Sequence, residues 1–210
     1  MAVVPLLVGW SAHDCILQEP PVTSLRDADI RQPLAQLAAR EYPGAQVLHE
    51  VGLEYGLVRV DVATISPECP HAFEVKADAD TLRRLPVQEM AYSAVFDRCT
   101  LVAGERHLER GQALVPAWWG VVLVRAEDGG VVLEEVRPAQ DNPAPGPGAT
   151  LRLMWRPEML ALLEASGAAR GVRSASKGRL LARLIEALPP AELRARVRQV
   201  VSARGDWRLT

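Results

Sequence analysis

The sequence predicts an α/β protein that carries a small helical domain at its carboxyl end. Alternating apolar and polar residues over 57–65 and 71–76 are typical of two paired strands. Segments with apolar residues at three- and four-residue spacing, typical of amphipathic helices, stand on both sides of these strands. A stretch rich in proline and glycine, 138–149, then separates this mixed region from a helical one over 150–210. We therefore expect a core over 25–137, a linker and a basic helical domain.

The amino-terminal part of the chain predicts a lead-in followed by one helix. Residues 1–24 combine a short apolar run with prolines, so we expect an irregular segment there. Either Ser24 or Asp29 can cap the helix that follows. The motif Tyr42-Pro43-Gly44 then ends it, because proline and glycine both interrupt a helix.

Three strands are expected next. The first covers 47–54, and Tyr55-Gly56 turns the chain into the hairpin formed by 57–65 and 71–76. The sequence Ser-Pro-Glu-Cys-Pro between the two hairpin strands suits a tight connection. The three strands are therefore predicted to form an antiparallel meander.

A second helix, one strand and a further hairpin complete the predicted core. Proline is tolerated only in the first turn of a helix, so the position of Pro86 predicts a helix over 85–96. A buried strand is expected over 99–103, and strands over 119–126 and 131–136 flank a strong glycine turn signal. The predicted order is α-β-β-β-α-β with an added hairpin.

Composition excludes several classes of protein. The chain is 49% hydrophobic and 24% charged, as in ordinary globular proteins. Cys15, Cys69 and Cys99 form no C-x-x-C pair, which argues against a structural zinc site and favours reduced thiols in a cytoplasmic protein. The apolar start, 3–10, has no basic flank and is too short to span a bilayer, so we expect no membrane association.

Charge is distributed unevenly along the chain. Residues 151–210 hold 12 Lys and Arg against 5 Asp and Glu, a net charge of +7, whereas residues 1–150 hold 12 against 21, a net charge of −9. A basic helical domain beside an acidic core fits a surface that faces nucleic acid, with Lys177 and Arg179 as candidate contacts. The alternative is that these arginines only solvate amphipathic helices.

The central hairpin carries charges that require an explanation. Side chains alternate across a strand, so Glu74 and Lys76 share one face, and a matching register places Asp61 beside them. Charge on a mostly apolar strand is costly unless it is paired or bound to metal. Two nearby carboxylates suit Mg²⁺ or Mn²⁺, and a neighbouring lysine can stabilise the charge that develops on a phosphate.

These residues also resemble a known family. Asp61 followed after a spacer by Glu74-Val75-Lys76 resembles the PD-(D/E)XK nuclease superfamily, and Gln88-Glu-Met-Ala-Tyr92 resembles the Q-x-x-x-Y element of its RecB-like branch. The resemblance implies a restriction-endonuclease-like core in which Asp61 and Glu74 bind the metal and Lys76 positions or activates water. It further implies that Gln88 and Tyr92 support the site or hold nucleic acid.

Other candidates remain open at this stage. A helix of the resembled superfamily often donates a glutamate to the metal site, and either Glu41 or Glu50 could fill that role or be a plain surface charge. Arg83 and Arg84 can meet phosphate or simply solvate their loop. We expect His107 to be structural or exposed.

The function predicted from these observations is Mg²⁺-dependent hydrolysis of DNA phosphodiester bonds, in DNA repair or in defence. One alternative is a DNA-binding or assembly protein that keeps the nuclease fold without catalysis. Another is a structural protein in which Asp61 and Lys76 form a cross-strand ion pair. The sequence leaves a homodimer, and the choice between DNA and RNA, open.

Overall fold

A computed structural model describes residues 24–53, 56–127, 130–146, 148–205 and 207, and it has the predicted α/β class. The predicted lead-in and Cys15 lie outside these residues. The helices and strands in chain order are α1 (Asp27–Glu41), β1 (Gln46–Leu53), β2 (Val58–Ile65), β3 (His71–Lys76), α2 (Leu85–Val95), β4 (Arg98–Gly104), α3 (Glu105–Leu114), β5 (Gly120–Glu127), β6 (Gly130–Arg137), α4 (Arg156–Ala165), α5 (Lys177–Ala187) and α6 (Pro190–Ser202), with short 3₁₀ turns η2 (Leu82–Arg84) and η3 (Thr150–Leu153).

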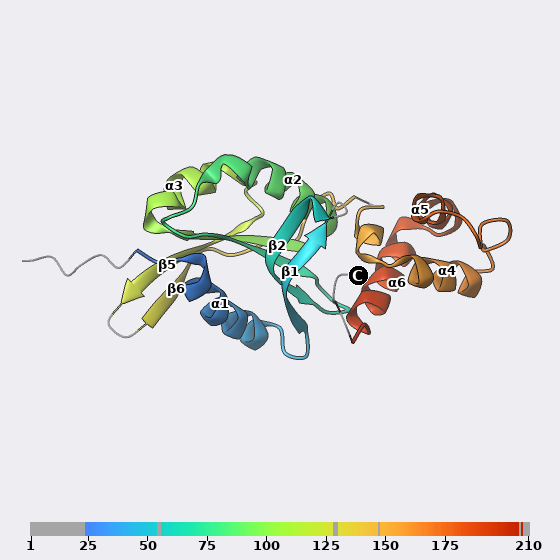
Figure 1. The fold of residues 1–210 in the computed structure, drawn as a ribbon, viewed down its shortest axis with the longest axis horizontal. Helices are drawn as coiled ribbons and strands as arrows, with labels where there is room; N and C mark the ends of the chain where they lie inside the picture. Colours follow the sequence, from blue (N-terminus) through green and yellow to red (C-terminus); the bar gives the residue numbers. More distant parts are fainter. Residues whose placement is uncertain (1–23, 54–55, 128–129, 147, 206, 208–210) are drawn as a thin grey trace, which may run out of the picture.

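The strands form one mixed sheet in the order of the sequence, β1 to β6. β1, β2 and β3 are an antiparallel meander, β3, β4 and β5 are parallel, and β6 returns antiparallel to β5. The α2 and α3 helices make the two crossovers between the parallel strands, as parallel neighbours require. Figure 1 shows α1 on one face of the sheet and α2 with α3 on the other. The predicted α-β-β-β-α-β order is therefore present, over residues 27–104 of the structure, and α3 is an addition.

Local signals explain where α1 and α2 begin and end. The Asp29 carboxylate accepts a hydrogen bond from the Arg26 backbone N–H at 2.9 Å. Asp29 therefore caps the amino end of α1 from the third position of the helix. Gly44, with a φ of 83°, follows the end of α1 in a left-handed conformation that suits glycine. Pro86 lies in the first turn of α2, as predicted.

Two apolar layers hold the sheet. Ile30, Leu34 and Ala38 of α1 pack on one face, against residues that include Phe73 and Val75 of β3. The other layer contains apolar residues of α2 and of the same sheet. Since Phe73 and Val75 face α1, the alternating residues of β3 face α2.

The carboxyl-terminal helices share a core with the sheet. One buried cluster contains Val51 and Leu53 of β1 together with Leu163 of α4, Leu184 of α5 and Val201 of α6. The boundary predicted over 138–149 is therefore no break in the apolar core. Figure 1 shows these helices at one end of the molecule, beside β1 and β2.

The proline- and glycine-rich stretch is docked on the core rather than extended away from it. It lacks helix and strand among its described residues, as predicted. The Asn142 side-chain amide donates to the carbonyl oxygens of Ser93 and Phe96 at 2.6 and 2.9 Å, at the end of α2. These bonds fix the stretch that leads to η3 and α4.

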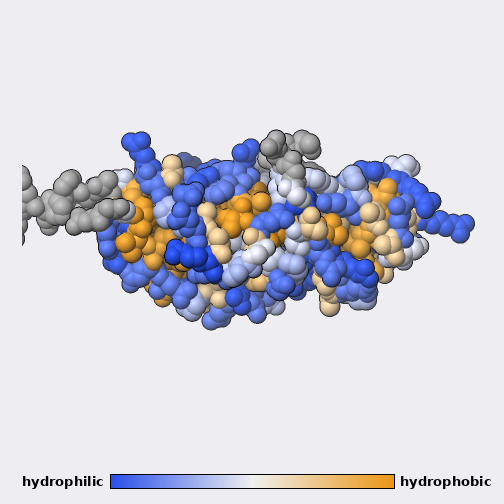
Figure 2. All heavy atoms as spheres, turned by 90° about the horizontal axis from the view of Figure 1, so that it is seen from below, coloured by the Kyte–Doolittle hydropathy of each residue, from blue (hydrophilic) through white to orange (hydrophobic). Residues whose placement is uncertain are grey.

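Two further observations concern apolar segments and the distribution of hydrophobic side chains. No helix among the described residues is long and apolar enough to cross a membrane. On the face shown in Figure 2, hydrophobic side chains gather in separate patches with hydrophilic ones between them.

Candidate active site

The candidate site is centred on β3, whose six residues are all buried. Glu74 is fully buried and Lys76 is 4% exposed, and both lie on the face covered by α2. A buried carboxylate and a buried ammonium are costly unless each has partners, so their contacts decide what the site is.

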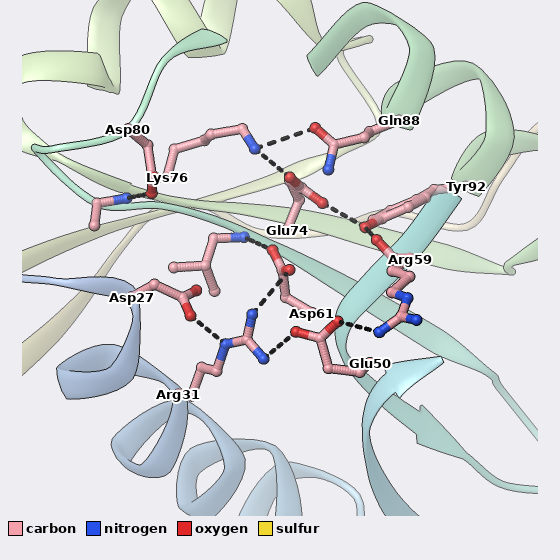
Figure 3. A network of polar contacts seen from close by, with 12 residues as sticks. Asp27, Arg31, Glu50, Arg59, Asp61, Glu74, Lys76, Asp80, Gln88 and Tyr92 are labelled. Carbon is pink, nitrogen blue, oxygen red and sulfur yellow. Dashed lines mark hydrogen bonds and ion pairs between the residues drawn. The ribbon is translucent and has the colours of Figure 1, made fainter. Parts of the chain in front are cut away.

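The structure brings together four of the residues predicted from the sequence. The Lys76 ammonium donates to Glu74 Oε1 and, at 3.1 Å, to Gln88 Oε1. The Tyr92 hydroxyl contacts Glu74 Oε2 and the Arg59 carbonyl oxygen, the latter at 2.7 Å. Gln88 and Tyr92 reach β3 together because they lie one turn apart on α2 (Figure 3). Lys76 therefore pairs with Glu74, in contrast to the Asp61–Lys76 pair considered above.

The Tyr92 hydroxyl has one proton for two acceptors. It can donate either to Glu74 or to the Arg59 carbonyl, and both contacts are hydrogen bonds only when Glu74 itself carries a proton. Burial raises the pKa of Glu74, and the Lys76 ammonium opposes that effect. Burial and the charge of Glu74 together raise the pKa of Tyr92, so its phenol stays protonated.

Asp61 lies at the point where β2 and β3 stop pairing. The last paired residues at this end are Val62 and Phe73, which adjoin Asp61 and Glu74 along the chain. The Asp61 carboxylate accepts the Val75 backbone N–H at 2.8 Å, in place of a strand carbonyl. Burial and the nearby charge of Glu74 raise the pKa of Asp61 to about 7, despite the opposing Val75 N–H.

A second set of charges surrounds Asp61 on the side of α1. The Arg31 guanidinium contacts Asp27 at 2.5 Å through Nε, Glu50 through Nη1 and Asp61 at 3.4 Å through Nη2. The Nε contact is an ion pair without the alignment of a hydrogen bond. Arg59 also approaches Glu50, at 3.7 Å. Figure 3 shows Arg31 and Asp27 coming from α1, below Asp61.

The structure distinguishes Glu41 from Glu50, the two glutamates that the sequence offered as further residues of the metal site. Glu50 belongs to the Arg31 cluster and has a φ of 55°, a left-handed conformation that is unusual for a residue with a side chain. Glu41 instead lines a cavity of about 390 Å³ with Glu135, and burial followed by the charge of Glu135 raises its pKa. Glu50 is therefore the glutamate near Asp61.

The same cavity contains a buried histidine that the sequence analysis did not select. His71 contacts the Tyr42 hydroxyl through Nδ1 at 2.6 Å and Thr100 Oγ1 through Nε2 at 2.8 Å. Burial lowers the pKa of His71 to about 3, so the ring is neutral at physiological pH. No motif in the sequence marks this residue, because its two partners come from α1's end and from β4.

The remaining basic candidates lie apart from one another. Arg83 and Arg84 are exposed on η2, and the charge of Arg84 partly opposes the rise that burial causes in the pKa of Glu74, so Arg84 is within electrostatic reach of the site. Lys177 donates to the Arg152 carbonyl at 3.3 Å and Arg179 is exposed, both at the start of α5. His107 is buried on α3, and its Nε2 lies 2.9 Å from the Asp80 carbonyl oxygen.

Several arginines of the basic region bind carboxylates inside the protein. Arg194 and Arg198 of α6 each approach Asp97 at 2.7 Å, which ties α6 to the turn before β4. Arg204 approaches Glu158 at 2.6 Å and lies between the rings of Trp155 and Trp207, at 4.1 Å from each. The excess positive charge of this region therefore serves partly to hold it together.

The oxygen atoms at the centre of the site all have protein partners. Asp61 contacts Arg31 and the Val75 N–H, while Glu74 contacts Lys76 and Tyr92. Within the described ranges, no group of three or more His, Cys, Asp or Glu residues is placed to hold a metal ion. The chemistry of the set still fits a hard cation, because the buried carboxylate of Glu74 and the part-buried carboxylate of Asp61 are close enough for the charge of one to act on the other. Asp61 and Glu74 would be the ligands.

The fold and the site define an α/β protein with a buried carboxylate and lysine cluster at the centre of a mixed sheet. Residues 34–206 match the family described as bacteriophage P4 protein cII, and the chain belongs to this family. No curated protein matches the chain. Asp61, Glu74, Lys76, Gln88 and Tyr92 lie inside the matched range, whereas Asp27 and Arg31 precede it.

Proposed function

We propose that this protein is a metal-dependent phosphodiesterase of the PD-(D/E)XK type that cleaves DNA. The observation that carries the proposal is the joint contact of Glu74, Lys76, Gln88 and Tyr92, four polar residues buried between β3 and α2. Such a cluster costs folding free energy, and perturbed carboxylates beside a lysine gather at functional sites. The α-β-β-β-α-β order supports the same type of core, although a fold alone does not define an activity.

Each residue has a role that follows from its contacts. Asp61 and Glu74 would hold Mg²⁺ or Mn²⁺, and the bound ion would supply a more acidic water and neutralise phosphate charge. Lys76 brings a positive charge to the same point, where it can stabilise the charge that grows on the phosphate. Gln88 and Tyr92 hold Lys76 and Glu74 in place and act as positioning residues.

DNA is the proposed substrate because exposed basic side chains lie near the site and elsewhere on the surface. The charge of Arg84 on η2 acts on Glu74, and the neighbouring Arg83 and, on α5, Arg179 are exposed. We place the protein in the cytoplasm, where the free thiols of Cys69 and Cys99 would stay reduced. We expect a protein that cleaves DNA in the cytoplasm to act in DNA repair or in defence.

The decisive experiment compares wild type with Glu74→Gln on single- and double-stranded DNA, in Mg²⁺, Mn²⁺ or chelator. Glu89→Gln is a matched control, because Glu89 lies beside Gln88 on α2 but accepts a hydrogen bond from Ser93. We expect cleavage in wild type and in the control, and none in Glu74→Gln or with chelator. Cleavage that survives in Glu74→Gln would refute the assignment of this site.

A second function, DNA binding without catalysis, is favoured by one observation. Glu74, Lys76, Gln88 and Tyr92 are each at most 8% exposed, so a DNA phosphate has little access to them in this conformation. A binding module would retain DNA affinity with no cleavage by wild type in any metal. The same incubations, read by both gel retardation and cleavage, separate the two functions.

A further inference from the structure

Arg31 is bound by carboxylates that come from three different elements. Its three guanidinium nitrogens contact Asp27 on α1, Glu50 on β1 and Asp61 on β2, each nitrogen a different carboxylate. Asp27 and Arg31 are one helical turn apart, so α1 can hold the guanidinium in a fixed direction. The cluster therefore forms only when α1 is docked on the β1–β2 hairpin.

The Arg31 guanidinium lies next to the proposed metal site. Asp61 is one of the two proposed metal ligands, and Arg31 is in ion-pair contact with it. Lys76 is in ion-pair contact with Glu74, and its charge also acts on Asp61 from a longer distance. Figure 3 shows the guanidinium on the side of Asp61 that faces α1, between Asp61 and Glu50. The Arg31 side chain is 25% exposed, so this side of Asp61 is also the one that opens towards solvent.

We propose that Arg31 is the resident counter-ion of Asp61 and that a divalent cation binds at Asp61 only by displacing it. This inference rests on the proposed function for the identity of the metal ligand. An arginine cannot give up its proton at physiological pH, so it can release Asp61 only by moving away. Metal binding is then coupled to the position of the Arg31 side chain or of α1, which keeps the site closed until that movement occurs.

The test measures Mn²⁺ affinity of the full-length protein by the electron paramagnetic resonance signal of free Mn²⁺. Arg31→Met removes the competing charge, and we expect about tenfold tighter binding, or more, because a close charge contact with Asp61 is lost. Arg40→Met is the matched control, since Arg40 is exposed on the same helix and bonds the Gln36 carbonyl. It should bind Mn²⁺ as wild type does.

Two further variants keep the test decisive. Arg31→Lys keeps the positive charge but cannot contact all three carboxylates at once. We therefore expect its Mn²⁺ affinity to lie between those of wild type and Arg31→Met, and this variant can be measured even if Arg31→Met folds poorly. Adding Asp61→Asn to Arg31→Met should abolish the gain. Equal Mn²⁺ affinity in wild type and both Arg31 variants, or a gain that survives Asp61→Asn, would overturn the inference.

The failure of this inference is distinguishable from failure of the proposed function. Tighter Mn²⁺ binding by Arg31→Met without DNA cleavage by any form would support the counter-ion role and refute the nuclease. Metal-dependent cleavage by wild type, with no gain in Mn²⁺ affinity in the Arg31 variants, would support the nuclease and refute the counter-ion role. The melting temperature without metal reports whether each variant folds.

Discussion

Replacing Lys76 with methionine tests whether the buried Glu74–Lys76 pair of β3 is held together by charge. Methionine keeps an unbranched apolar stem but removes the ammonium that contacts Glu74 and Gln88. Glu74 is then left fully buried without a cation. Breaking a buried ion pair from one side costs about 3–5 kcal/mol, because the remaining charge is uncompensated. For a protein of this size the corresponding drop in melting temperature is about 10 °C.

The assay is urea unfolding of wild type, Lys76→Met, Glu74→Gln and the double variant at pH 8. The double variant removes both charges, so its loss should be smaller than the sum of the two single losses by about 2 kcal/mol. Additive losses would show that the two side chains do not interact as the structure indicates. DNA cleavage should be absent from all three variants.

The pH dependence of Lys76→Met gives an independent check. Burial already raises the pKa of Glu74, and loss of the ammonium raises it further. A carboxyl whose pKa is higher in the folded than in the unfolded state destabilises the folded state at pH values above the folded-state pKa. This loss of stability disappears as pH falls from the folded-state pKa towards the ordinary value of 4.5, because the folded protein then binds the proton. The deficit of Lys76→Met relative to wild type should therefore shrink between pH 8 and pH 5, and a constant deficit would refute this explanation.

Three other changes have defined outcomes. Tyr92→Phe removes the hydroxyl that contacts Glu74 and the Arg59 carbonyl, so urea unfolding should show a loss of about 1–3 kcal/mol, and unchanged stability would mean that neither contact contributes. Burial lowers the pKa of His71 to about 3 from its ordinary 6.5, so the folded state resists protonation. Wild type should lose about 3 kcal/mol relative to His71→Gln between pH 8 and pH 4.5, and parallel pH profiles would contradict this. Deletion of 150–210 should abolish cooperative thermal unfolding, followed by circular dichroism, because it exposes the core that β1 shares with the last helices; a sharp melt would show an independent domain.

Much of the central sheet could be predicted because its signals are local. The two-residue period of a strand determines that Glu74 and Lys76 share a face, and both do contact the residues of α2. Pro86 likewise determines where α2 starts, which places Gln88 and Tyr92 one turn apart. In each case the decisive interactions lie within a few residues of one another, so a short window of sequence contains them.

The helix α3 and the joining of the last helices to the sheet were not predicted. Residues 105–114 contain few apolar side chains, and Gly111 among them lowers the helix propensity of the segment. The stretch 138–149 resembles a linker by composition, yet Asn142 docks it on the end of α2. Composition describes a segment's own preferences and not the surface against which it packs.

The amino-acid sequence by itself determined the α-β-β-β-α-β order up to β4, the face shared by Glu74 and Lys76, and the helix that brings Gln88 and Tyr92 to them. Only the tertiary structure decided that Glu50 rather than Glu41 lies near Asp61, and that the Arg31 guanidinium contacts both Glu50 and Asp61. Arg31 and Asp61 are 30 positions apart and belong to different elements. Their contact depends on how α1 packs across the sheet, a geometry set by the many apolar contacts of Ile30, Leu34 and Ala38 together rather than by any local pattern.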